Sequence, residues 1–289
     1  RTGSVRGFLK DWYNNNFGSI GDEAAALEEE FRQLAIVRRV EHLKADIFSF
    51  EAYGNEAARF MNRMRSVFER TRALLESLEG ARCAAFFEVF AVKVYAAYFT
   101  YASFHFADKS RLFHRQGLEA KAEECVGLSR SFDEFKKRTL YYYNKVIFDG
   151  KWDEILTPED FPPPCMSLYP ETKPALKLSP DDIAGISKAV TESALLPLQT
   201  SKEGFMENDG YVSMLAEHFE KNNGFKEIKR LGRFEGSLME SHGGSIEYRF
   251  NTVSEGCFRF ELFRFPSLNS VGRLRIAVSV DGLEPLVLE

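Results

Sequence analysis

The sequence contains few residues whose types and spacing could support chemistry, and the adjacent Glu217 and His218 are the first of them. A carboxylate beside an imidazole could act as a general base or as a hydrogen-bonding pair for a sugar. They end the segment that begins at Tyr211, which we expect to be a strand. An ordinary acid and histidine at a strand end is the favoured alternative, because adjacent strand residues face opposite sides of a sheet.

An aromatic cluster supplies the second candidate site. Tyr141-Tyr142-Tyr143-Asn144 is followed by Gly150-Lys151-Trp152. Aromatic rings stack on sugar faces, so this cluster could line a carbohydrate site. The simpler interpretation is that the rings close one end of a helical bundle, since aromatic side chains bury large areas wherever they lie. The candidate substrate-binding residues are therefore Tyr143, Trp152, Tyr211, Glu217 and His218.

Motifs for other chemistry are absent from the sequence. The histidines form no H-x-x-x-H pair, and the four cysteines form no C-x-x-C, so we expect no metal site. There is no G-x-S-x-G nucleophile elbow and no phosphate-binding glycine loop. Glycoside hydrolysis needs two carboxyl groups on either side of the bond, and no pair stands out. We therefore predict no catalytic residue and no cofactor in this chain.

Composition limits the class of protein. The 289 residues are 44% hydrophobic and 28% charged, which is typical of a globular protein of one large or two ordinary domains. The net charge of −5 disfavours sequence-independent nucleic-acid binding. The start, Arg1-Thr2-Gly3-Ser4, has no initiator Met and no apolar targeting stretch, so we expect a fragment.

Helical periodicity dominates the first half of the sequence. We expect a first helix capped by Ser19 or Asp22 and extending to about Leu43. A second helix should begin after Asn55, with a left-handed glycine, Gly80, beyond its end. A last helical stretch should start near Leu112, break around residues 127–131 at a capping box formed by Ser131 and Glu134, and continue to about Phe148.

The segment from Cys83 to Phe106 is apolar on nearly every side. Glu88 and Lys93 interrupt it, so a membrane span is disfavoured and a central helix shielded by its neighbours is expected. Together the helices predict an antiparallel bundle over residues 1–155.

Period-two alternation marks the second half as β structure. Residues 246–250, 258–262 and 274–280 alternate apolar with polar side chains, and Asp281-Gly282 indicates a turn before a last strand. We predict an antiparallel β-sandwich of jelly-roll type over residues 201–289, incomplete if strands are missing. Proline-rich residues 156–200 should be a linker or wrapping segment.

An ordered set of short segments resembles the C-terminal half of glycoside hydrolase family 115. In chain order these segments are Val37–Leu43 with Ile47–Ser49, Phe86–Glu88 with Val92-Lys93, Arg111-Leu112 with Gln116-Gly117, Tyr142–Asn144 with Gly150–Trp152, Gly204-Phe205 with Asp209–Ser213 and Ala216–His218, Leu231–Arg233, and Ser267–Asn269 with Gly272–Arg275 and Ala277–Ser279. The resemblance implies a helical bundle followed by a β module. It also implies an α-glucuronidase that acts on glucuronoxylan and works outside the cell, although this chain has no signal peptide.

The sequence departs from that family in two respects, and both affect the function that we expect. The catalytic (β/α)8 barrel that precedes the bundle in the family is not in this sequence, and the loop after Trp152 differs. We therefore expect an accessory portion with a structural or dimerisation role that is not catalytic alone. The partners expected are a second copy of the chain, an upstream barrel and a xylan-type glycan, with no nucleic acid and no membrane. The alternatives are a carbohydrate-binding module and a bundle-based protein-interaction scaffold.

Overall fold

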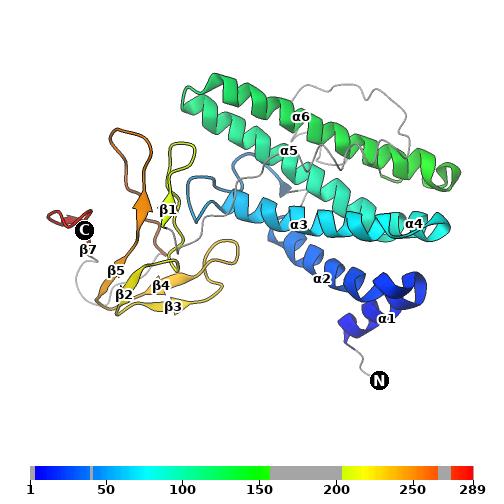
Figure 1. The fold of residues 1–289 in the computed structure, drawn as a ribbon, viewed down its shortest axis with the longest axis horizontal. Coiled ribbons are helices and arrows are strands. Elements are labelled where there is room, and N and C mark those ends of the chain that lie inside the picture. Colours follow the sequence, from blue (N-terminus) through cyan, green and yellow to red (C-terminus); the bar gives the residue numbers. More distant parts are fainter. Residues whose placement is uncertain (1–3, 40–41, 157–203, 266–274, 289) are drawn as a thin grey trace. The chain divides into compact units, whose positions relative to one another are not determined.

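The structure, a computed structural model, describes residues 4–39, 42–156, 204–265 and 275–288, with helices first and short strands after them (Figure 1). Its contacts divide the chain into two compact units, Arg1–Val253 and Ser254–Glu289. The order of helical and β parts agrees with the sequence prediction. The predicted proline-rich segment, 156–200, lies outside the described residues apart from Leu156.

Among the described residues, six α-helices and four short helical turns form the first part of unit 1. In chain order they are α1 (Val5–Phe17), η1 (Gly18–Ile20), α2 (Gly21–Val37), α3 (Glu56–Glu76), α4 (Gly80–Phe86), the π-helical η3 (Phe87–Ala91), α5 (Val92–Arg115), α6 (Glu119–Tyr141), the π-helical η4 (Tyr142–Val146) and η5 (Ile147–Gly150). The Asn55 side chain accepts a hydrogen bond from the Ala58 amide at 3.0 Å, so the predicted cap is confirmed. The first predicted helix was wrong in extent, because α2 ends at Val37 rather than Leu43.

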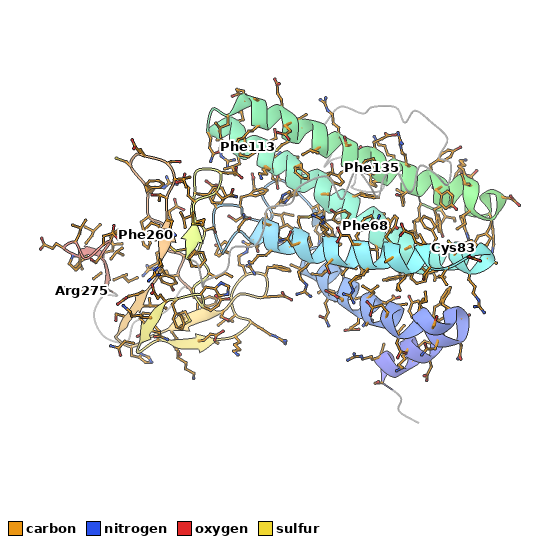
Figure 2. All side chains as sticks on the ribbon, viewed as in Figure 1. Phe68, Cys83, Phe113, Phe135, Phe260 and Arg275 are labelled. Atoms are coloured by element: carbon orange, nitrogen blue, oxygen red, sulfur yellow. The ribbon has the colours of Figure 1, made fainter. Side chains whose placement is uncertain are left out.

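The apolar segment is the central helix of the core. Almost every side chain of α5 is buried, and so are Phe86, Phe87 and Phe90 just before it. Phe68 of α3 lies within the helical part (Figure 2) and stacks on Tyr98 with 4.7 Å between ring centroids. The run Gly80–Arg115 is long and apolar enough to cross a membrane, but 67% of its apolar window is buried inside the protein. The prediction of a shielded helix is confirmed.

Helices α5 and α6 form an antiparallel pair joined at Gly117, whose φ is 75° (Figure 1). Two small residues allow close approach, since the Ser129 hydroxyl donates to the Ser103 carbonyl at 2.7 Å. The predicted break at residues 127–131 was wrong. Ser131 lies inside α6 and donates to the Gly127 carbonyl, a pattern compatible with a continuing helix.

The β part consists of four separate two-stranded sheets among the described residues. The strands are β1 (Phe205–Met206), β2 (Lys221–Asn223), β3 (Lys226–Ile228), β4 (Leu238–Glu240), β5 (Ser245–Glu247), β6 (Phe250–Asn251), β7 (Ile276–Val278) and β8 (Leu286–Leu288). β1 and β6 pair in parallel, and the pairs β2–β5, β3–β4 and β7–β8 are antiparallel. The expected jelly-roll sandwich is not formed by these strands.

Two predicted strands are wrong. Tyr211 makes a single bridge with Asn208, and residues 212–219 form no strand. Leu215 instead packs on Gly54, and Glu217 accepts a hydrogen bond from the Ser237 amide. Residues 258–262 have no strand partner within the part of the chain that the structure describes, and their apolar side chains are exposed. Alternation shows which side chains share a face, but a strand also requires a neighbour to complete its ladder.

The last hairpin agrees with the sequence. Asp281 and Gly282 have φ angles of 51° and 74°, as the left-handed positions of a tight hairpin turn require. The turn joins β7 to β8, where Ala277 pairs with Val287. This hairpin belongs to unit 2, Ser254–Glu289.

Candidate functional site

The most organised group of polar contacts joins α3 to residues 213–237, and we call this group the joint. At its centre Glu56, almost completely buried, accepts from Arg233 Nε at 2.9 Å through one carboxylate oxygen. The other oxygen accepts from the Ser49 amide at 3.1 Å. Arg233 also donates to the Ile47 carbonyl at 2.9 Å. A buried carboxylate is stable only when paired and hydrogen-bonded in this way.

Arg59 donates hydrogen bonds to main-chain carbonyls on both sides of this joint. It donates to the Phe234 carbonyl at 2.6 Å, and it also reaches the carbonyls of Tyr53 at 2.8 Å and Gly54 at 3.2 Å. Burial lowers the pKa of the guanidinium, and the charges of Glu217, Glu56 and Glu235 oppose this. An arginine keeps its charge under these conditions, so Arg59 acts as a fixed donor to carbonyl groups of two loops.

The ring of Phe234 is the apolar part of the joint. It is buried, and it meets Phe60 edge-to-face with 5.4 Å between centroids. Arg59 also lies over this ring, 5.4 Å from its centroid. Burying a phenylalanine against an aromatic ring and a guanidinium adds apolar and cation–π stabilisation to the hydrogen bonds.

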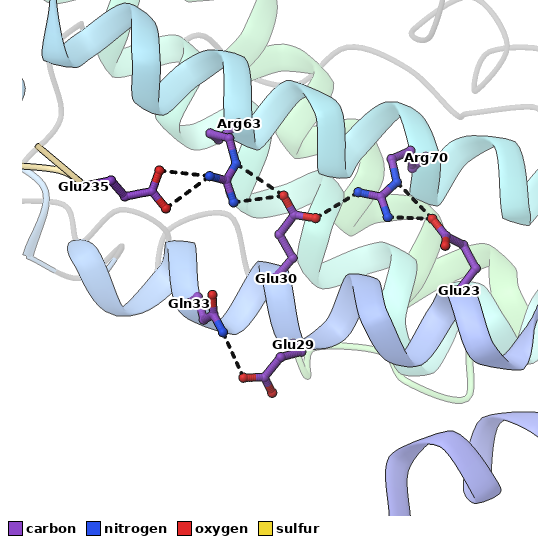
Figure 3. A network of polar contacts seen from close by, with 7 residues as sticks. All are labelled: Glu23, Glu29, Glu30, Gln33, Arg63, Arg70 and Glu235. Carbon is purple, nitrogen blue, oxygen red and sulfur yellow. Dashed lines mark hydrogen bonds and ion pairs between the residues drawn. The ribbon is translucent and has the colours of Figure 1, made fainter. Parts of the chain in front are cut away.

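A chain of ion pairs continues from the joint along the surface of α2 and α3 (Figure 3). Arg63 lies between Glu235, at 2.9 Å, and Glu30, at 3.1 Å. Arg70 pairs with the other oxygen of Glu30 at 2.8 Å and with Glu23 at 2.6 Å. These side chains are partly exposed, so each pair contributes little alone, but the shared Glu30 fixes the spacing of the two helices.

Loop residues complete the joint. The Asn55 amide donates to Ser213 Oγ at 2.8 Å, beside the cap of α3. Gly54, with a φ of 62°, lies so close to Leu215 that an added Cβ would be 2.3 Å from its Cγ. Leu215 therefore packs directly on a glycine, which accounts for the absence of a side chain at residue 54.

Tyr211 lies at a second contact, near the end of α5. Its neighbour Asp209 pairs with Lys109 at 3.2 Å, and the Asp209 carbonyl accepts from Gln116 at 2.6 Å. Tyr211 packs against the small cluster of Phe50, Ala57 and Leu112, and its hydroxyl is buried with no hydrogen-bond partner among the described residues. Burial, together with the charge of Asp209, raises the pKa of Tyr211, so the phenol stays protonated.

Glu217 and His218 contact different neighbours in this part of the chain. One oxygen of Glu217 accepts from the Ser237 amide at 3.0 Å, and its charge supports Arg59. The ring of His218 lies parallel to that of Phe205 at 6.4 Å. Glu217 Oε2 and His218 Nδ1 are buried without a partner in the described parts of the chain. The two residues lie at a turn, not at the strand end that the sequence indicated.

Tyr143 and Trp152 lie at the end of the helical part, as the simpler interpretation predicted. Their rings are parallel, with centroids 6.4 Å apart, and Trp152 packs against the main core. Lys151 covers the indole at 4.3 Å. The tryptophan is thus held between the core and a lysine.

The five candidate residues do not form one site. Phe87, just before α5, contacts Tyr142, whereas Asp209, two residues before Tyr211, pairs with Lys109 near the other end of that helix. The intervening helix spans about 35 Å at 1.5 Å per residue. Tyr143 and Trp152 therefore lie far from Tyr211.

Asp108 and Glu56 are buried carboxyl groups in the described part of the chain. Asp108 and His105 line a cavity of about 20 Å³ with apolar walls, which is too small for a sugar. Glu56 is engaged by Arg233. The described residues contain no group of three or more His, Cys, Asp or Glu able to hold a metal ion. What these contacts can do is hold two parts of the chain in a fixed arrangement.

Sequence reasoning did not identify Arg59 and Phe234 as central residues. Arg59 follows two buried alanines on α3 and precedes buried Phe60, so its position within an apolar stretch was the available signal. Arg233 belongs to the segment Leu231–Arg233, whose resemblance to the family gives no indication of its contact with Glu56.

Comparison with known proteins addresses the β part. Residues 204–289 match the Glycosyl hydrolase family 115 C-terminal domain. No curated protein matches the chain. The matched range contains Ser213, Leu215, Arg233, Phe234 and Glu235, so the joint attaches the helical part to this domain within unit 1. Over residues 204–289 the chain is therefore similar to the C-terminal domain of glycosyl hydrolase family 115.

Proposed function

We propose that this chain is an accessory portion of a family 115 glycoside hydrolase, in which the helical part holds the C-terminal domain in a fixed position. The observation that carries the proposal is the joint formed by Glu56, Arg59, Arg233 and Phe234. It combines a buried ion pair, several main-chain hydrogen bonds and an aromatic contact, and it lies between α3 and a segment that matches the family domain.

The same proposal assigns no catalytic role to the chain alone. Hydrolysis of a glycosidic bond requires two carboxyl groups roughly 5 to 9 Å apart beside a space that admits a sugar. The buried Glu56 is neutralised by Arg233, and buried Asp108 lines a cavity smaller than a sugar ring. The acid and base of the reaction would belong to a catalytic barrel outside these 289 residues, acting on glucuronoxylan.

The purified chain should be incubated with glucuronoxylan, with a family 115 α-glucuronidase as the positive control. We expect no release of (4-O-methyl)glucuronic acid above the buffer blank over hours. Release at enzymatic rates would overturn the accessory assignment. Affinity electrophoresis in xylan gels tests the carbohydrate-binding alternative, for which retardation of the chain relative to gels without glycan is the required result.

A protein-interaction scaffold built on the apolar helix is disfavoured. Phe86, Phe90, Tyr95, Tyr98 and Phe99 are all at most 1% exposed, so this helix offers no surface to a partner. A scaffold would have to use other faces of the helical part.

A further inference from the structure

The turn after β2 contains the dipeptide Asn223-Gly224, which is the one Asn-Gly pair among the 289 residues. Asn223 is the last residue of β2, and Gly224 follows outside the strand with a φ of 87°. Both residues are exposed, and so is Asn222 before them. Two neighbouring asparagines therefore meet the same solvent but are followed by different residues.

The side chains of these two asparagines are held differently. Asn222 Oδ1 accepts from the Phe225 amide at 2.9 Å, and Asn222 Nδ2 donates to the Phe225 carbonyl at 2.9 Å. Asn223 lies on the opposite face of the strand. Its side chain makes no hydrogen bond within the part of the chain that the structure describes. The Asn222 amide is thus fixed, whereas that of Asn223 can rotate.

We propose that Asn223 is a site of spontaneous chemical modification, at which the side-chain amide becomes a carboxylate through a cyclic imide. The deprotonated main-chain nitrogen of Gly224 attacks Asn223 Cγ. A carbon–nitrogen bond forms, the bond from Cγ to Nδ2 breaks, and the departing nitrogen takes up protons from water and leaves as ammonia. Gly224 favours the attack because it has no Cβ to shield its nitrogen.

Water completes the reaction by opening the ring at either of its two carbonyl groups. Opening at one carbonyl gives aspartate, and opening at the other gives isoaspartate, in which the main chain runs through the former side chain. The net change replaces the amide nitrogen with an oxygen from water. No oxidant or reductant is needed, and each product carries one added negative charge.

The two products should differ in their effect on the β2–β5 pair. These strands lie side by side, and Asn223 pairs with Ser245 (Figure 1). Their backbones are close, since a Cβ added at Gly244 would lie 2.1 Å from the Asn223 carbonyl oxygen. Isoaspartate inserts a methylene into the main chain at residue 223, so the groups of the ladder no longer align. Aspartate leaves the main chain unchanged and should preserve the pair.

Incubation of the purified chain at pH 8.5 and 37 °C, followed by trypsin and tandem mass spectrometry, tests the site. Cleavage after Lys221 and Lys226 gives a peptide that contains both asparagines, so Asn222 is the control within the same peptide. We expect at least about fivefold more conversion at Asn223 than at Asn222, because only Asn223 precedes a glycine. The conversion should yield both aspartate and isoaspartate, and it should slow at pH 6, where less of the attacking nitrogen is deprotonated.

Equal conversion at the two asparagines, or no conversion at Asn223, would overturn the proposal. Conversion to aspartate alone would also overturn it, because direct hydrolysis without the ring gives no isoaspartate. Asn223→Gln should remove isoaspartate from this peptide, since the longer side chain would have to close a larger ring. Isoaspartate that persists in this variant would assign the reaction to Asn222 instead.

A second experiment tests the effect on the main chain. Asn223→Asp carries the same added charge as the isoaspartate form but has an unaltered main chain, so it is the matched control. Hydrogen exchange should be severalfold faster for the β2 amides of the isoaspartate form, whose peptide separates from the aspartate form by reversed-phase chromatography. Asn223→Asp should exchange as the wild type does. Equal exchange in the two forms would contradict the predicted loosening of the β2–β5 pair.

Discussion

Arg233 Nε lies 2.9 Å from the Oε1 atom of Glu56, and the two residues are separated by 177 positions in the sequence. The Glu56 side chain is 3% exposed, whereas that of Arg233 is 48% exposed. The acid is therefore enclosed by the fold, and the base reaches it from the surface. This asymmetry determines which substitution is the more damaging.

Arg233→Ala should destabilise the protein by about 3 kcal/mol, because it leaves a buried carboxylate without its counter-charge. Urea unfolding followed by circular dichroism measures the change. Arg63→Ala is the matched control, since it removes a partly exposed pair with Glu235 and should cost at most about 1 kcal/mol. Equal losses for the two variants would show that burial of Glu56 does not decide the energetics.

Phe234→Ala should loosen the C-terminal domain from the helical part. The ring is buried against Phe60, and its removal should cost about 3 kcal/mol. Because Phe234 is not part of the helices, we expect their circular dichroism to persist while limited proteolysis within residues 205–253 accelerates severalfold. Phe250→Ala, which removes a ring that is 41% exposed, should leave the cleavage rate nearly unchanged. Unaltered proteolysis of Phe234→Ala would contradict the proposal that the helical part holds the C-terminal domain in a fixed position.

Asp108 and His105 should give opposing dependences of stability on pH. Burial raises the pKa of Asp108 to about 6, although Arg111 opposes it, and burial lowers the pKa of His105 to about 3, with Lys109 adding to the shift. Asp108 therefore contributes stability at low pH that is lost as pH rises through 6. His105 contributes stability above about pH 6.5 that is lost as pH falls toward 3.

Single variants should separate the two effects. Between pH 4.5 and 7, the stability of Asp108→Asn relative to wild type should increase with pH, by about 2 kcal/mol. The stability of His105→Phe relative to wild type should decrease over the same range. Thermal unfolding at each pH measures both differences. Slopes of the same sign for the two variants would refute the assignment.

Gly54→Ala should cost more than Gly80→Ala. Both glycines have positive φ, 62° and 54°, so both substitutions carry similar backbone strain. Only at residue 54 would the new Cβ meet Leu215, at 2.3 Å, whereas at residue 80 nothing lies within 4 Å. The difference in free energy of unfolding between the variants should be about 1 to 3 kcal/mol. A difference near zero would show that Leu215 moves away freely.

Trp152→Ala tests whether the aromatic pair stabilises the helical part or binds a glycan. Trp152 is half-buried against the core and stacked on Tyr143, so the variant should lose about 2 kcal/mol of stability. Its mobility in xylan gels should equal that of the wild type. Retardation of the wild type that disappears in the variant would instead assign this pair to glycan binding.

The sequence by itself determined the helical character of the first half and the helices whose local signals are strongest. Sustained 3–4 spacing marked α3, Asn55 marked its start, and the continuous apolar run marked the central α5, because these signals are local and repeat at each turn. The Asp281-Gly282 turn was likewise readable, since its left-handed backbone favours particular residues. The ordered family likeness also located the C-terminal domain that the comparison found at residues 204–289.

Tertiary structure alone decided where the isolated polar residues act. Nothing in the local sequence indicates that Arg59 reaches the Phe234 carbonyl or that Arg233 reaches Glu56, because each contact joins residues more than 170 positions apart. The same limit explains the wrong strands. Alternation over residues 258–262 specifies an apolar face, but the identity of the neighbouring strand depends on a partner elsewhere in space.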